Sequence, residues 1–440
     1  MSRKQRQPIF TEISSIDDCL APILELGKKK FGDDRVYTGK ESEARLVGLK
    51  LPALCLRYLF QLNVFPLSRM LQITGTQESC KSAFLYELYR WFRCNRGKAY
   101  HIENETKDSD TLRMSLLNYD REAVGLFISE SLEDWMKTVT WLLSTKDGLK
   151  AKLLGTKDKP GPGKSVPLIL GVDSLMAKSS MESIEKIEAE GFTDRAFPID
   201  ALKISSYLKF MPQKLSGWPF VFAATNHLKP QKSRTGVIEY NVPGGFSVKF
   251  QETFELRLSR VKDIESVNRP GVTVKFVTAK NSLGPSRKQI LANMRWYFDR
   301  DDEYRQKTYW DWNSASIHLL DTFKGSIRKD LEDVCDISVV PVSGKGKYIW
   351  SKALDIPRSD PQPASHAGAV LEQREDLLVE LHKILGVRTY SSFMPGVCYD
   401  QQLADASSAV EIAEGYAADH HDGEPDEGTD QAEVAGGLAE

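Results

Sequence analysis

The sequence predicts an α/β fold with a mostly parallel central sheet. From about residue 49 to residue 300, short apolar runs of strand length alternate with segments of helical period, which is typical of parallel strands covered by helices. One apolar run ends in a glycine-led turn that opens into a helix, as phosphate-binding loops do. A chain of 440 residues also has room for about two to three domains.

The glycine-led turn spans residues 75–82, with the sequence GTQESCKS. In phosphate-binding loops a glycine begins the turn, backbone amides and a lysine hold the phosphates, and a Ser or Thr hydroxyl binds Mg²⁺. Here Gly75 begins the turn, Lys81 is the lysine and Ser82 is the magnesium ligand. The other residues expected to bind ATP in this loop are Glu78, Ser79 and Cys80. Cys80 stands where the motif has its second glycine, a residue favoured there for its dihedral freedom.

The alternation continues after the turn. The expected strands are residues 99–103, 124–128, 166–172 and 219–225, and the expected helices are 84–92, 131–145 and 196–211, with Pro212 ending the last one. The strand at 166–172 leads into Asp173, at the sheet edge where ligands bind in open α/β folds. An aspartate there can hold magnesium through water, which complements Lys81 and Ser82. Residues 146–165 are rich in Lys and Gly and are expected to form a surface loop.

A long basic segment, residues 228–245, follows the strand that ends at Thr225. Loops of this length in compact domains are usually functional or disordered. The segment contains the basic residues Lys229, Lys232 and Arg234 and ends in Gly244 and Gly245. Beyond the segment, residues 254–259 and 272–276 alternate apolar and polar side chains, which predicts antiparallel strands that extend the sheet.

Charge is unevenly distributed along the chain. Residues 399–440 hold 12 of the 61 acidic residues and no Lys or Arg, so residues 1–398 carry 59 basic against 49 acidic side chains, a net charge of +10. An acidic tail on a basic body suits a polyanion-binding protein whose tail competes for the basic surface. A solubilising tail with no regulatory role is the alternative.

The sequence lacks the patterns of membrane-spanning or secreted proteins and of cysteine-based metal or disulfide sites. No run of about 18 uncharged apolar residues and no signal-peptide core is found, so we expect a soluble intracellular protein with no membrane partner. The six cysteines are scattered without a CxxC pair, which argues against both a zinc site and a disulfide framework.

Taken together, the motifs resemble those of RecA-type recombinases, and most closely the phage UvsX-like branch. The resemblance covers about residues 49–298, and its motifs follow the family's order. UvsX-type proteins also carry a non-glycine residue at the position of Cys80. Residues 101–105, HIENE, look like the strand-end acidic motif whose second acid activates the attacking water, which assigns that role to Glu105. Residues 172–174, VDS, match the Walker B ending around Asp173.

The end of the next strand also fits the family. Residues 225–227, TNH, resemble the strand end that senses the γ-phosphate, with His227 as the sensor. Residues 244–250, GGFSVKF, look like the segment that closes the second DNA-binding loop. This resemblance implies that Lys229, Lys232, Arg234, Gly244 and Gly245 contact DNA phosphates and backbone. The resemblance implies that contact between His227 and the γ-phosphate orders residues 228–245, an order-disorder switch.

A basic segment near residue 280 resembles the one that crosses the subunit interface to a neighbour's ATP. Lys280 matches one of its two basic positions, which implies a catalytic role in trans. The other position is Ser282, and Arg287 or Lys288 is a candidate to replace it in space. A further DNA loop is expected around residues 177–195. The basic residues it offers are Lys178, Lys186 and Arg195.

The resemblance implies a RecA-like ATPase core over residues 49–300. An N-terminal arm or oligomerisation element would precede it at 1–48, and a small α or α+β C-terminal domain, 301–398, and a disordered acidic tail, 399–440, would follow. The implied function is an ATP- and Mg²⁺-dependent, DNA-dependent ATPase that forms helical filaments on single-stranded DNA and exchanges strands with double-stranded DNA in recombination and repair. Mediator and single-strand-binding proteins are the implied partners, in the cytoplasm of a bacterium or a phage-infected host.

Two other functions remain open at this point. A RecA-fold hexameric helicase or translocase shares the phosphate-binding loop, the Walker B aspartate and a trans-acting cation. Such a motor is expected to carry an arginine at Lys280 and to lack the segment at 244–250. A non-catalytic, nucleotide-dependent DNA-binding scaffold is the second alternative, motivated by Cys80 and Ser282.

Overall fold

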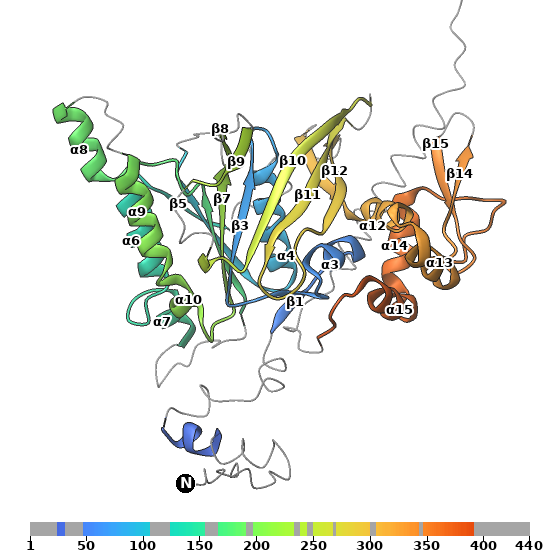
Figure 1. The fold of residues 1–440 in the computed structure, drawn as a ribbon, viewed down its shortest axis with the longest axis horizontal. Helices are drawn as coiled ribbons and strands as arrows, with labels where there is room; N and C mark the ends of the chain where they lie inside the picture. The colour runs from blue at the N-terminus through green and yellow to red at the C-terminus, as the bar shows by residue number, and fades with distance from the viewer. Residues whose placement is uncertain are drawn as a thin grey trace, which may run out of the picture. The chain divides into compact units, whose positions relative to one another are not determined.

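A nine-stranded sheet runs through the described part of the chain (Figure 1). The computed structural model describes residues 24–30, 47–105, 124–154, 166–190, 197–232, 238–243, 250–266, 270–299, 305–342 and 346–390. In spatial order the strands are β13 (Arg305–Asp311), β12 (Gln289–Asp299), β11 (Gly271–Asn281), β10 (Phe254–Ile264), β3 (Arg69–Gly75), β7 (Phe220–His227), β6 (Leu168–Asp173), β4 (Lys98–Glu103) and β5 (Val124–Ile128).

The six strands from β10 to β5 pair in parallel, and β10 to β13 pair antiparallel. The predicted α/β class with a mostly parallel central sheet is therefore confirmed. The amphipathic strands expected after residue 250 are β10 and β11, which pair antiparallel with each other as predicted, but β10 also pairs in parallel with β3, so the antiparallel extension begins at β11. Among the described helices, none is both long enough and apolar enough to span a lipid bilayer.

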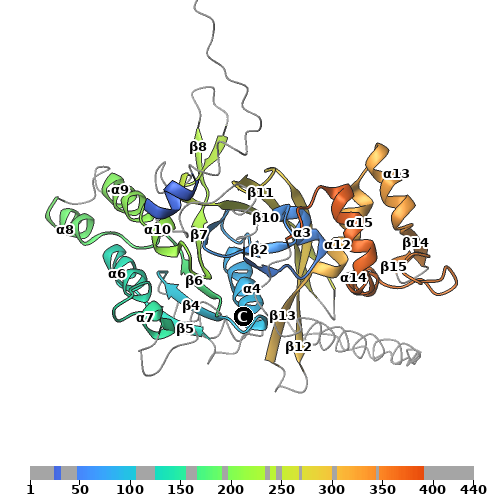
Figure 2. The same cartoon turned by 90° about the horizontal axis from the view of Figure 1, so that it is seen from below.

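Helices cover both faces of the parallel strands (Figures 1 and 2). Leu168, Leu170 and Val172 of β6 contribute to a buried apolar cluster with α6 (Leu132–Leu142), α9 (Phe197–Leu208) and α10 (Met211–Leu215). Because side chains alternate along a strand, Gly171 faces the opposite side. There it meets Tyr89 of α4 (Lys81–Cys94), the helix that follows the glycine-led turn at 75–82.

Two expectations for these connections are wrong. Pro212 does not end a helical run but occupies the first turn of α10, where its missing N–H costs nothing. The connector at 146–165, expected to be a loop, contains the short helix α7 (Leu149–Leu154), and its residues 155–165 lie outside the described part.

An aromatic core joins α4 to the antiparallel side of the sheet. The rings of Phe84, Phe276, Trp310 and Trp312 pack within about 5 to 6 Å of one another, and Trp310 stacks on Trp312 at 5.2 Å. Edge-to-face and offset contacts of this kind add to the free energy gained by burial. These two tryptophans are therefore core residues.

A second apolar cluster joins the helix α3 (Leu54–Phe60) to the C-terminal part of the chain. The strands β1 (Gly48–Lys50) and β2 (Val64–Pro66), on either side of α3 in the sequence, form a small pair. After β13, the C-terminal elements are α12 (Trp312–Thr322), α13 (Gly325–Val334), β14 (Ser338–Val342), β15 (Gly346–Trp350), α14 (Ala364–Gln373) and α15 (Glu375–Leu385). Glu372 accepts the Leu54 backbone N–H at 2.6 Å and pairs with Arg57 at 2.8 Å. Burial raises the pKa of Glu372, while Arg57 opposes that rise.

The C-terminal elements bear on the expected domain limits. The boundary placed near residue 300 lies in the hairpin between β12 and β13, so β13 belongs to the central sheet. The expected acidic tail lies outside the described residues, as does most of the N-terminal arm, of which residues 24–30 are helical.

The pH dependence of stability should carry a contribution from His382 of α15, which is buried near Arg57. Burial lowers the pKa of its imidazole from 6.5 to about 4. A lowered native pKa stabilises the protein above pH 6.5, and this contribution is lost as pH falls from 6.5 toward 4. We expect His382→Gln to flatten the pH dependence of the unfolding free energy in this window by no more than about 3 kcal/mol.

Urea unfolding at several pH values measures this contribution. The control is His366→Gln, which replaces an exposed histidine of α14. Equal pH slopes for the wild type and both variants would contradict the assignment.

Candidate active site

The carboxyl ends of four parallel strands meet at one pocket. In the sheet register, Gly75 of β3 lies opposite His227 of β7, and Glu103 of β4 lies opposite Asp173 of β6. The pocket is lined by residues 77–83 of the loop and the start of α4, together with Glu105, Asp173 and His227. The four groups that the sequence assigned to nucleotide chemistry, on four different strands and their loops, therefore lie side by side.

The loop after β3 turns tightly at Gly75. A Cβ on Gly75 would lie 2.2 Å from Ser79 Oγ and 2.5 Å from the Leu258 carbonyl oxygen, so only glycine fits. Lys81 Nζ donates to the Thr76 carbonyl at 2.6 Å and lies 3.4 Å from Ser79 Oγ, so the loop curls around the ammonium group. A helix N-terminus beside such a loop favours anions, because its first backbone N–H groups lack intrahelical partners.

Cys80 adopts the backbone conformation that glycine has in the usual motif. Its φ is 63°, in the left-handed region, and it caps α4 without a side-chain hydrogen bond. Burial raises the pKa of its thiol to about 11, against the opposing charges of Arg260 and Lys81. The thiol is therefore protonated at neutral pH and is no nucleophile.

Asp173 fits a magnesium site. Its side chain is buried, Thr225 Oγ1 donates to Oδ1, and Oδ2 has no hydrogen-bond partner among the described residues. An unpartnered buried carboxylate oxygen facing a pocket suits a cation or its water. Mg²⁺ typically takes one or two carboxylates, with phosphate oxygens and waters completing the shell. Asp173 and the Ser82 hydroxyl, both on the pocket wall, are the groups that would hold it.

Two acidic residues end β4, and the structure separates their roles. Glu105 lines the pocket, with Oε1 3.3 Å from His227 Nε2. Glu103 lies in the interior, 3% exposed, and accepts the Glu105 backbone N–H at 2.5 Å. Asn104, between them, donates its backbone N–H to the Asp173 carbonyl at 2.9 Å, so the two strand ends are tied together.

Sequence reasoning assigned no role to Asn104 or Arg260. Arg260 of β10 reaches the loop from the neighbouring strand, with NH1 3.4 Å from Glu78 Oε2, and also pairs with Asp263. Its proximity follows from the parallel pairing of β10 with β3, which places Leu258 opposite Gly75. No local pattern indicates a pairing across more than 180 residues, and Asn104 has no signal beyond its place between two acids.

The basic segment expected to be a loop contains a hairpin. β8 (Lys229–Lys232) pairs antiparallel with β9 (Ile238–Asn241), and Lys229 is exposed. Asn226 Nδ2 donates to the Pro243 carbonyl at 2.9 Å, so the returning chain is fixed beside the end of β7. The expected DNA contacts Arg234, Gly244 and Gly245 lie outside the described residues, as does the Lys232 side chain.

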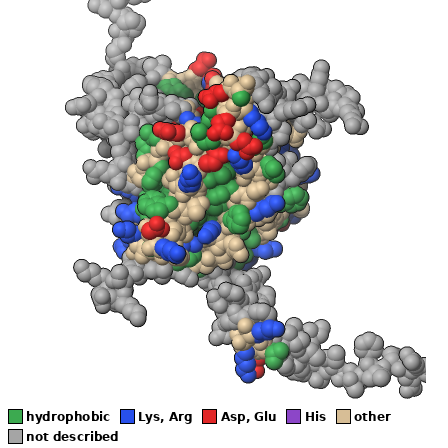
Figure 3. All heavy atoms as spheres, turned by 90° about the vertical axis from the view of Figure 1, so that its left-hand side faces the viewer, with side chains coloured by type: hydrophobic (Ala, Val, Ile, Leu, Met, Phe, Trp, Pro, Cys, Tyr) green, Lys and Arg blue, Asp and Glu red, His purple; other side chains and the backbone are tan. Residues whose placement is uncertain are grey.

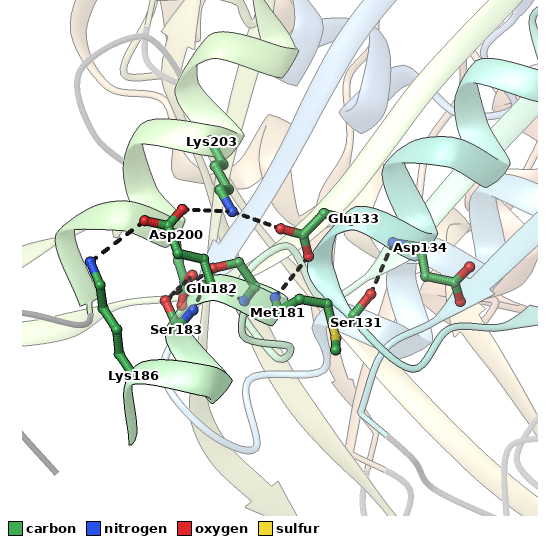
Figure 4. Close-up of polar contacts among 10 residues, drawn as sticks. Ser131, Glu133, Asp134, Met181, Glu182, Ser183, Lys186, Asp200 and Lys203 are labelled. Carbon is green, nitrogen blue, oxygen red and sulfur yellow. Dashed lines mark hydrogen bonds and ion pairs between the residues drawn. The ribbon is translucent and has the colours of Figure 1, made fainter. Parts of the chain in front are cut away.

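The segment expected to form a further DNA loop contains the helix α8 (Met181–Glu190). Acidic side chains gather on the face that α6, α8 and α9 share (Figure 3), and those exposed on α8 include Glu182, Glu185 and Glu188. Lys203 of α9 lies 2.8 Å from Glu133 and 3.2 Å from Glu182 (Figure 4).

These carboxylates bear on the basic residues expected to contact DNA in this segment. Lys186 pairs with Glu182 at 3.5 Å, which weakens the case for a DNA contact there. Lys178 lies between β6 and α8, outside the pocket, and its DNA contact stays a prediction. Arg195 lies outside the described residues.

The segment expected to act across a subunit interface lies on β11 and the turn after it. Lys280 donates to the carbonyl oxygens of Glu252 at 2.6 Å and Phe250 at 3.3 Å, and burial lowers its pKa. It does not line the pocket of its own chain, and its contact with a neighbour's nucleotide stays a prediction. Lys288 lies 4.9 Å from the centre of the Tyr58 ring, a cation–π contact that Arg287 does not share.

The left-handed backbone of Cys80 leads to a test of the loop. We expect Cys80→Gly to raise the unfolding free energy by about 1 kcal/mol, because a side chain in this region carries a steric cost that glycine avoids. Binding of a fluorescent ATP analogue should be retained. Cys94→Gly, at the last residue of α4, is the control; no left-handed backbone is relieved there, so it should not stabilise the protein. Destabilisation by Cys80→Gly would mean that the thiol itself supports the loop.

Comparisons with known proteins add no family assignment. No family model matches the sequence, and neither does any curated protein. The function of the site is therefore inferred from its own geometry and from the motifs in the sequence.

Proposed function

We propose that this protein is an ATP-dependent DNA strand-exchange recombinase of the RecA type, active as a helical filament on single-stranded DNA. The observation that carries the proposal is the convergence of the loop at 75–82, Glu105, Asp173 and His227 on one pocket. The motif order in the sequence supports the DNA-related part. Hydrolysis would be stimulated by DNA, with Mg²⁺ as the cofactor.

The proposed chemistry assigns one task to each side chain. Lys81 and the backbone N–H groups of the loop neutralise and hold the phosphates, and Ser82 and Asp173 hold the metal. The magnesium ion, when bound, offsets charge on the phosphate oxygens. Glu105 accepts a hydrogen bond from water and orients it toward the γ-phosphorus. Phosphoryl transfer depends mainly on positioning and charge neutralisation. The side chains named here would supply both of these contributions.

His227 would couple nucleotide state to DNA binding. Its ring nitrogen is 3.3 Å from Glu105, and the next residue, Leu228, donates its backbone N–H to the Gly75 carbonyl at 3.0 Å. The hairpin of β8 and β9 starts immediately beyond. A change in the contacts of His227 therefore acts at the base of the basic segment, where Lys229 is exposed. A cation from a neighbouring subunit, Lys280, would make hydrolysis depend on assembly.

The first test removes the general base. We expect Glu105→Gln to lower DNA-stimulated ATP hydrolysis by at least about 100-fold, because the amide no longer accepts the proton of the attacking water. Binding of ATP and of single-stranded DNA should persist. Phosphate release in a steady-state assay measures the loss.

The matched control is Glu130→Gln, which removes an exposed carboxylate just past the end of β5, outside the pocket. It should keep the wild-type rate. An undiminished rate in Glu105→Gln would eliminate the assignment of Glu105.

The second test concerns the basic segment. Replacing Lys229, Lys232 and Arg234 with Ala should lower the affinity for single-stranded DNA and reduce its salt dependence by up to about 0.7 in slope for each phosphate that the variant no longer binds. Fluorescence anisotropy at several salt concentrations measures both. Alanine at the exposed Lys137, Lys152 and Lys209 removes the same charge elsewhere and should have a smaller effect. Equal effects of the two triple variants would mean that only net charge matters.

The whole proposal is decided by three-strand exchange with ATP and with a slowly hydrolysed analogue, together with electron microscopy. Joint molecules and helical filaments on single-stranded DNA are the expected result. Closed rings that unwind duplex DNA would replace the recombinase with the hexameric motor. Nucleotide-dependent DNA binding without hydrolysis would replace it with the scaffold.

A further inference from the structure

A chain of buried polar side chains runs behind the candidate active site, from α4 to the end of β4. The Tyr89 hydroxyl and His101 Nδ1 are 2.8 Å apart, and His101 Nε2 is 3.4 Å from Glu103 Oε2. The other oxygen of Glu103 accepts the backbone N–H of Glu105 at 2.5 Å. Tyr89 and His101 are fully buried, and Glu103 is nearly so.

A neutral imidazole satisfies both contacts of His101. With the proton on Nε2, the ring donates to the Glu103 carboxylate, and Nδ1 accepts the Tyr89 O–H. Each group in the chain then has a partner, which is the condition for burying polar groups without a large cost. The two ends of the chain are the helix that begins with Lys81 and the backbone of Glu105.

The fold makes room for this chain. Gly171 of β6 lies directly opposite His101 in the sheet register. A Cβ on Gly171 would lie 1.7 Å from the Tyr89 hydroxyl oxygen, so any larger residue would displace the hydroxyl. The interior strand β6 thus lacks a side chain at the point where the hydroxyl lies.

Stability alone does not account for such a chain. Replacing buried ionic and polar groups with well-packed apolar groups of similar volume often leaves the stability of a protein unchanged or raises it. The distinctive property of this chain is its end point, because Glu105 is the residue whose carboxylate lines the pocket and contacts His227.

We propose that Tyr89, His101 and Glu103 are positioning residues that hold the Glu105 backbone, and with it the Glu105 carboxylate, at a set place relative to α4. The inference rests on the proposed function, since it assigns how the water-orienting group is aligned with the helix that holds the phosphates. A displacement of about 1 Å at a reacting group can lower turnover 100-fold. None of the three residues lines the pocket, so nucleotide affinity should not depend on them.

Three variants test the chain in the full-length protein. Tyr89→Phe should lower kcat for ATP about fivefold, the equivalent of one lost hydrogen bond. Glu103→Ala should lower it about 100-fold. In Glu103→Gln the carbonyl oxygen still accepts the Glu105 N–H, and the amide NH2 can donate to His101 Nε2 once the ring carries its proton on Nδ1 and donates to the Tyr89 oxygen. This variant should therefore restore most of the rate. In all three, KM and the affinity for a fluorescent ATP analogue should stay within about twofold of the wild type.

A second readout needs no activity. Hydrogen–deuterium exchange of the Glu105 amide, measured without nucleotide, should be faster in Tyr89→Phe and Glu103→Ala and close to wild type in Glu103→Gln. The control is Tyr207→Phe, which removes a hydroxyl bonded to the Met136 carbonyl at 2.9 Å and lies away from the pocket. It should change neither kcat nor exchange at Glu105.

A double variant separates positioning from general loss of structure. In a Glu105→Gln background, Tyr89→Phe should lower kcat no further, because the group that it aligns has already been removed. Full additivity of the two changes, or unchanged exchange at Glu105 in Tyr89→Phe and Glu103→Ala, would overturn the proposal. A wild-type protein without ATPase activity would refute the proposed function, while the exchange measurements would still decide whether the chain holds Glu105.

Discussion

The hydrogen-bond register of the parallel strands is the constraint on which the site depends. One slip of register between β3 and β7, or between β6 and β4, would turn the terminal side chain of a strand to the other face of the sheet. In the observed register Gly75 meets His227, and Glu103 meets Asp173. The apolar residues under α6, α9 and α10 enforce this register, because a slip would expose them. The core thus determines where the polar groups lie.

The helix α4 has two structural roles in this arrangement. Its first turn borders the pocket and the loop at 75–82, and the helix supplies Phe84 and Trp91 to the aromatic core. Glu87 accepts the indole N–H groups of both Trp91 and Trp312, at 2.8 and 2.9 Å. These contacts anchor α4 in the core. The loop at 75–82, which leads into α4, is therefore joined to a fixed helix.

Much of this could be predicted from the sequence, for identifiable reasons. Asp173 and His227 follow continuous apolar runs, which mark buried strands, and parallel strands bring their ends to one edge. The roles of Glu103 and Glu105 could not be separated by alternation, since both have the same parity. They differ because β4 ends at Glu103, so Glu105 lies beyond the strand and lines the pocket. Arg260 could not be predicted because its neighbour in space is 182 residues away, and α7 could not because its lysines resemble those of a loop.

Gly171 illustrates how an absent side chain constrains a family of sequences. The space above it is taken by the hydroxyl of Tyr89, from an element 82 residues earlier in the chain. A methyl group at 171 is tolerated only if a smaller residue stands at 89, and that exchange removes the hydroxyl. The two positions are therefore expected to vary together among divergent relatives, and this covariation would be visible even where the loop sequence has drifted.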